Sequence, residues 1–221
     1  MGALVRGRRP LRAGDEPPHP QAPGGGAGHA ARQQGRDHAA ARGHPYLFVQ
    51  PQQPTEAYVC IPRHFSESRR YITVGHFGPD VIAGDANFTA LDPDGLVFAA
   101  ISSTMFATWQ KTIGGRIKSD IRFASTLTWN TFPFPDVSDA DRQRIIEAGE
   151  GVLAARRLQP GKSLADLYQP LGMARELLDA HRALDKAVDK VFGFAKPPAE
   201  PQRQARLFER YQEMTSVGQL G

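Results

Sequence analysis

The chain changes its periodicity at the segment Thr131-Phe132-Pro133-Phe134-Pro135, and this change constrains the fold most. Two prolines in three positions stop a helix or a central strand, because proline lacks a backbone N–H and fixes φ. Before this connector, runs of β-branched and aromatic residues favour strands; after it, apolar residues recur at helical spacing. We therefore expect an α+β protein, with a small mixed α/β domain over 45–135 and an all-helical bundle over 136–217.

Residues 1–44 have a different composition from the rest of the chain. They contain nine glycines, five prolines and no aromatic residue. Their seven arginines and three acids (7 − 3 = +4) account for the whole net charge of +4, so the pI says nothing about binding by residues 45–221. Such a stretch buries too little apolar surface to offset its ordering entropy. We expect a disordered tail; an out-of-frame reading of GC-rich DNA would have the same composition, and both interpretations stay open.

The pattern predicts short strands on the N-terminal side of the connector. The runs with strand-like composition are Pro45–Val49, Ala57–Ile61, Tyr71–Val74, Ala86–Leu91 and Ser125–Trp129. A helix capped by Asp94 is expected to continue to Gly114, because apolar residues recur about every four positions between them.

The pattern predicts four helices beyond the connector. Two pairs have capping-box spacing, Ser138 with Asp141 and Ser163 with Asp166, and mark the starts of two helices. A third helix has an apolar stripe that contains His181, which we interpret as a core histidine rather than a catalytic one. A last helix follows Pro198. The one cysteine, Cys60, lies in an apolar run and is expected to be a small buried hydrophobe.

A stretch of alternating residues follows Gly114-Gly115. Its charged residues share one parity and its mostly apolar residues share the other, which predicts a single strand with one charged face. Lys118 and Asp120 on that face would lie about 7 Å apart. Lysine donates to guanine O6 and N7, and a carboxylate accepts from the cytosine amino group, so we predict that these two residues read DNA bases. A strand face that meets only water is the alternative. The charged set is Arg116, Lys118, Asp120 and Arg122.

The segment 62–70 is a polar loop that holds three arginines, Arg63, Arg69 and Arg70. Such a loop can contact phosphates, although an ordinary solvated connection has the same composition. We predict phosphate contacts for these three residues and for Arg116 and Arg122.

The motifs of several enzyme classes are absent from the sequence. There is no G-x-G-x-x-G after a strand, no P-loop and no G-x-S-x-G elbow. No His/Cys cluster has metal-ligand spacing, and no apolar run is long enough to span a membrane. We therefore expect no catalytic residue, no metal and no cofactor site in this chain, which would not be an enzyme on its own.

From about His44 to Thr215 the chain resembles the C-terminal end of MmeI-like type IIG (IIL) restriction–modification enzymes. The resemblance rests on the order and spacing of many short blocks. These are Pro45-Tyr46-Leu47-Phe48, Gln53-Pro54-Thr55, Arg69-Arg70-Tyr71-Ile72, Gly115-Arg116-Ile117-Lys118-Ser119-Asp120, Thr131 to Pro135, Leu164 to Tyr168, Ala180 to Asp185, Ala187-Val188-Asp189 and Leu207 to Tyr211.

The resemblance implies a partial target-recognition domain over 45–135 and a C-terminal helical domain over 136–217. The parent enzymes are S-adenosylmethionine-dependent, adenine-specific DNA methyltransferases with a fused magnesium-dependent nuclease. Their catalytic domains lie upstream and are not matched here. The resemblance further implies double-stranded DNA as partner, a bacterial cytoplasmic location, and selection of a G·C pair by the residues at Lys118 and Asp120.

A second function class stays open at this point. In it the helical segment docks on a separate methyltransferase subunit, and the charged strand faces solvent without reading DNA. Phosphate-dominated binding falls steeply with salt and apolar docking does not, so salt dependence separates the two.

Overall fold

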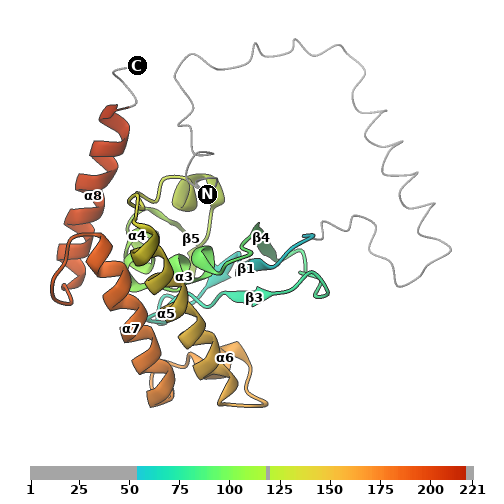
Figure 1. Cartoon of the computed structure of the whole chain (residues 1–221). Helices are drawn as coiled ribbons and strands as arrows, with labels where there is room; N and C mark the ends of the chain where they lie inside the picture. The colour runs from blue at the N-terminus through green and yellow to red at the C-terminus, as the bar shows by residue number, and fades with distance from the viewer. Residues whose placement is uncertain (1–53, 118–119, 218–221) are drawn as a thin grey trace, which may run out of the picture. The chain divides into compact units, whose positions relative to one another are not determined.

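The protein is described by a computed structural model over residues 54–117 and 120–217 (Figure 1). Its first sheet has the strand order β3-β1-β4, with β1 at Tyr58–Pro62, β3 at Gly75–Phe77 and β4 at Asn87–Leu91. Both pairings are antiparallel; β1 is the central strand, and its side chains Val59 and Ile61 are buried in the hydrophobic core. The strands predicted at 57–61 and 86–91 are confirmed, and Cys60 is buried as expected. The strand predicted at Pro45–Val49 lies outside the described residues.

The prediction of a strand at Tyr71–Val74 was wrong. These residues are buried, but the strand ladder begins only at Gly75. The carbonyl of Val74 accepts a hydrogen bond from Nη1 of Arg156 at 2.7 Å. The side chain of Arg156, from a helix distant in the sequence, therefore bonds a backbone carbonyl that would otherwise pair with a neighbouring strand.

The second sheet has the order β2-β6-β5, with β2 at His64–Phe65, β5 at Gly115–Ile117 and β6 at Asp120–Arg122. The prediction of a single strand was wrong, because the chain reverses between β5 and β6. Ile117 pairs with Asp120, so two residues separate the strands, and Arg116 lies opposite Ile121. Directly opposite residues share a face. The even-numbered residues of β5 and β6 consequently fall on opposite faces of this sheet.

The helix predicted after Asp94 is two helices, α3 (Leu96–Ile101) and α4 (Thr104–Ile113). Ser103 starts the second helix, since its Oγ accepts a hydrogen bond from the Phe106 N–H. Asp94 accepts from the Leu96 N–H, as a cap. The buried carboxylate of Asp92, which the pattern did not indicate, also accepts from two N–H groups of α3. As predicted, α4 ends at Gly114.

The strand predicted at Ser125–Trp129 was also wrong, because these residues form a π-helical turn, η2. The turn presents the carbonyl of Thr128 to the indole Nε1 of Trp109, which donates a hydrogen bond at 3.1 Å. The proline-containing connector that follows has no regular structure, as predicted.

The helical segment matches its prediction. It contains α5 (Asp139–Arg157), α6 (Leu164–Leu167), α7 (Arg175–Val191) and α8 (Glu200–Val217) (Figure 1). Ser138 caps α5, and Ser163 with Asp166 forms a complete capping box at α6. The α+β fold class is therefore confirmed. One hydrophobic core contains residues from both sides of the connector, and α5 packs against α3 as well as α7.

His181 lies in this core, as predicted, and joins the two sides of the connector. Its ring stacks on Tyr71 with 3.9 Å between centroids, and its Nε2 is 2.7 Å from the Tyr168 hydroxyl. Burial, followed by the positive charge of Arg156, lowers the pKa of His181 to about 3. His181 is therefore a neutral structural residue at physiological pH.

Candidate nucleic-acid interface

The β2-β6-β5 sheet has one apolar and one polar side along β6. Phe65 and Ile121 lie opposite each other and are buried. Asp120 and Arg122 are exposed on the other side. The alternation predicted from the sequence therefore holds within β6, although it does not extend across the chain reversal.

Arg122 occupies the centre of the exposed side. It pairs with His64 on β2 and with Gly115 on β5, so these three residues form a row across the sheet. All three are exposed. His64 was not predicted as a site residue, and its place beside Arg122 depends on a strand pairing that no local sequence pattern encodes.

Gln110 fixes the position of this row against α4. Its side-chain Nε2 donates to the backbone carbonyl of Arg122 at 3.0 Å. Its backbone carbonyl accepts from the N–H of Gly114 at 2.9 Å. The N–H of Phe123 donates to the carbonyl of Arg63 at 3.0 Å. The backbone that carries Arg63 and Arg122 is thus held by a buried helix, which suits a recognition surface.

The five arginines predicted to contact phosphate differ in their surroundings. Nη1 of Arg116 lies 2.6 Å from Oε1 of Glu67, and Nη1 of Arg69 donates to Thr73 at 2.9 Å. The guanidinium groups of Arg63 and Arg70 lie over aromatic rings, those of Phe88 and Tyr71. Among the described residues, Arg122 alone of the five has no side-chain hydrogen bond, ion pair or ring contact.

Arg116 and Glu67 form an exposed ion pair, with 45% and 44% of their side-chain surfaces accessible. Glu67 was not predicted to matter, although its place in the arginine-containing loop was the available signal. The pair reduces the positive charge that Arg116 offers to a phosphate.

Lys118, the predicted partner of Asp120, lies outside the described residues. Asp120 is exposed at the start of β6. Because Ile117 pairs with Asp120, the argument that set Lys118 and Asp120 side by side along one strand does not apply. Their assignment as base-reading residues stays a prediction.

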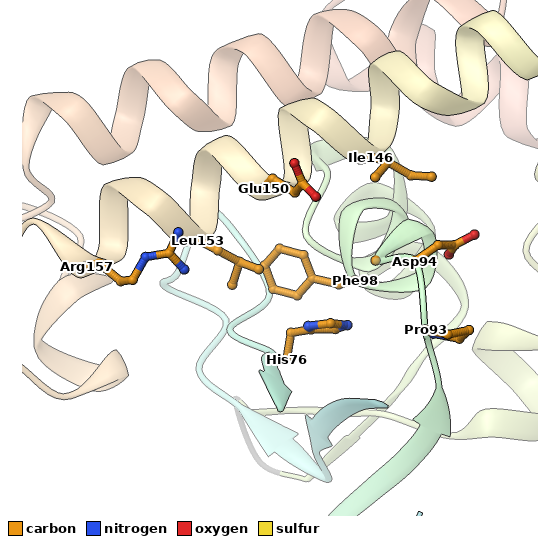
Figure 2. Close-up of a pocket in the computed structure, with 9 residues that line it drawn as sticks. His76, Pro93, Asp94, Phe98, Ile146, Glu150, Leu153 and Arg157 are labelled. Carbon is orange, nitrogen blue, oxygen red and sulfur yellow. The ribbon is translucent and has the colours of Figure 1, made fainter. Parts of the chain in front are cut away.

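A separate cleft of ≈ 320 Å³ lies between α5 and the start of α3 (Figure 2). In Figure 2, Ile146, Glu150, Leu153 and Arg157 follow one another along α5 opposite His76 and Phe98. The first N–H groups of α3 are already bonded to the carboxylates of Asp92 and Asp94. This helix start is therefore unavailable to the phosphate or carboxylate of a cofactor.

Within residues 54–117 and 120–217, no three His, Cys, Asp or Glu side chains are arranged to hold a metal ion. None of the helices described there is both long enough and apolar enough to cross a membrane.

Two family models match the chain. The model of the MmeI target recognition domain matches residues 27–136, and that of the MmeI C-terminal domain matches residues 137–217. The first match begins inside the segment 1–44 that we interpreted as a tail.

Two individual proteins are similar over most of the chain. DNA methyltransferase A of Bacillus subtilis (strain 168) is 34% identical over 171 residues, which are 77% of this chain and 19% of that protein. A solved structure of the type IIL restriction-modification enzyme MmeI in complex with DNA superimposes with a TM-score of 0.72 at 40% identity. It covers 82% of this chain, which spans 24% of that enzyme. The chain thus belongs to the MmeI family and contains that family's target recognition and C-terminal domains.

Proposed function

We propose that this chain is the DNA-recognition module of an adenine-specific DNA methyltransferase of a type II restriction–modification system. The observation that carries the proposal is the match of residues 27–136 to a target recognition domain. This match includes the exposed row of His64, Arg122 and Gly115, which is the polar surface that a duplex would meet. Double-stranded DNA is the proposed partner, and the bacterial cytoplasm is the proposed location because its DNA is there.

We assign two kinds of DNA contact to the residues predicted from the sequence. Lys118 and Asp120 read base edges, which suits a G·C pair. Arg122 contacts a phosphate, supported by its exposure and by the absence of an ion pair with any described residue. Arg63, Arg69 and Arg70 contact phosphates near the β2 strand. Arg116 makes the weakest phosphate contact, because Glu67 already lies against it.

The two segments matched by the family models have different proposed roles. Residues 45–135 read the DNA, and the helices of 136–217 support them through the shared hydrophobic core. Methyl transfer and cleavage belong to parts of the longer relatives that this chain does not match, and S-adenosylmethionine and magnesium act there. The cleft beside α3 offers no free N–H group at that helix start to the carboxylate of a methyl donor, because Asp92 and Asp94 already accept from those groups.

The alternative of a helical docking module that does not read DNA is not favoured. It leaves unexplained why the target recognition model extends through both sheets. A methyltransferase subunit or domain is the second proposed partner, since this chain spans only 19% and 24% of the two similar proteins.

A selection from random duplexes tests the proposed function. The full chain is incubated with a library of randomised double-stranded DNA, and the bound fraction is sequenced after several rounds. We expect one enriched motif, and an affinity for it that falls steeply as salt rises, because phosphate contacts release counterions. Recovery of no motif, with salt-independent binding, would contradict the proposal.

A further inference from the structure

Two adjacent glycines, Gly114 and Gly115, follow α4, and only the first is required by its surroundings. A β-carbon at Gly114 would lie 2.3 Å from the carbonyl oxygen of Gln110, so only glycine fits there. A β-carbon at Gly115 would have no atom within 4 Å, and Gly115 does not adopt a positive φ. Neither packing nor backbone conformation within the described residues requires glycine at position 115.

Glycine at position 115 is unfavourable for the strand in which it lies. Gly115 begins β5, an edge strand of the β2-β6-β5 sheet. Strands favour β-branched and aromatic residues, and glycine in a strand supplies no cross-strand contact. A glycine in a strand often marks a place where a ligand or another backbone approaches closely. The open space at Gly115 therefore points to something that occupies it.

The neighbours of Gly115 indicate which kind of chemical group would lie over it. Gly115 pairs with Arg122, and Arg122 pairs with His64, so a guanidinium lies between an imidazole and an empty position on one exposed face. A guanidinium and an imidazole both donate hydrogen bonds to phosphate oxygens. The nearby acid Glu67 is bonded to Arg116 and does not neutralise Arg122.

We propose that one sugar–phosphate strand of the duplex passes over Gly115, and that Arg122 and His64 both contact its phosphates. Gly115 is the approach path, Arg122 supplies the charge, and His64 is an additional contact from β2. This inference rests on the proposed function, because it requires that the chain binds DNA.

The test is the substitution Gly115→Leu in the full chain. Leucine is compatible with an extended backbone, and its β-carbon at position 115 would have no atom within 4 Å. We expect the affinity for the selected duplex to fall by about tenfold or more, since a charge-assisted contact is lost. The slope of log affinity against log salt should become shallower by roughly one.

Gly151→Leu is the matched control. Gly151 is an exposed glycine in α5, and a β-carbon there would also have no atom within 4 Å. This variant should bind DNA like the wild type. Thermal unfolding of both variants checks that each is folded. His64→Ala should weaken binding by about three- to tenfold, equally on duplexes that differ by single base pairs.

Each outcome separates the inference from the function on which it rests. If the wild type shows no preference among duplexes, the proposed function fails. If the wild type binds selectively and folded Gly115→Leu binds equally well, only the inference fails. A loss on the selected duplex that disappears on duplexes altered at one base pair would show a base contact at Gly115 and overturn the phosphate assignment.

Discussion

Gly149 of α5 and Ala99 of α3 lie in direct contact: a β-carbon at position 149 would come within 2.8 Å of the Ala99 Cβ. Ala99 lies in the segment matched by the target recognition model and Gly149 in that matched by the C-terminal model. The two helices therefore approach closely across the division between the models. This contact joins the helical segment to the sheets that present the candidate interface.

Gly149→Ala tests this contact. The extra methyl group must push α3 and α5 apart, so we expect a loss of about 1–2 kcal/mol in the free energy of unfolding despite the better helix propensity of alanine. Gly151→Ala, two residues further along α5, should instead stabilise the protein by roughly 0.5–1 kcal/mol, because its β-carbon enters open space. Urea unfolding of both variants measures the difference; equal effects would disprove the close contact.

His181 should make the stability depend on pH. Its pKa is about 3 in the folded protein and about 6.5 in an unfolded chain. Between these values the unfolded state binds a proton that the folded state does not, so stability falls as the pH drops below 6.5. From pH 7 to pH 5 the loss from this residue is about 2 kcal/mol.

The substitution His181→Gln isolates this contribution. The variant should be less stable than the wild type at pH 7, because it loses the stack on Tyr71. Between pH 7 and pH 5, however, the loss in its free energy of unfolding should be about 2 kcal/mol smaller than the loss in the wild type. Identical pH dependence in the two proteins would show that folding does not shift the pKa of His181.

Local signals predicted the helical segment well, because the information lies within a few residues. Ser138 and Ser163 each bond an N–H three positions ahead. Likewise, the spacing of Leu177, His181 and Leu184 alone indicated the buried face of α7. Such contacts are present in the sequence as patterns.

The predictions failed where a distant side chain decided the local structure. The segment Tyr71–Val74 has strand composition, but two of its polar groups bond to the helical segment. The Tyr71 hydroxyl donates to Asp185, and the Val74 carbonyl accepts from Arg156. Similarly, Thr104 donates two hydrogen bonds to Asp185 where the predicted single helix is interrupted. The reversal after Ile117 was missed because alternation alone does not reveal a turn. It was this reversal that separated Arg116 from the face of Arg122.

The ion pair between Arg116 and Glu67 predicts unequal effects of two arginine substitutions on DNA binding. Arg122→Ala should weaken binding to all duplexes and reduce the salt slope by roughly one. Arg116→Ala should have a smaller effect, because Glu67 already compensates its charge. Glu67→Gln should raise affinity by about threefold by freeing Arg116. Binding isotherms at several salt concentrations measure all three; a larger effect for Arg116 than for Arg122 would contradict the assignment.

The most direct test of sequence reading is competition binding by Lys118→Ala against a set of duplexes that each carry one substituted base pair. If Lys118 contacts a base edge, the variant should bind the preferred duplex about 1–3 kcal/mol more weakly and lose discrimination at one base pair while keeping it elsewhere. Arg70→Ala is the matched control, and it should weaken binding to every duplex alike. Equal losses on every duplex for Lys118→Ala would contradict the proposal that this residue reads the DNA sequence.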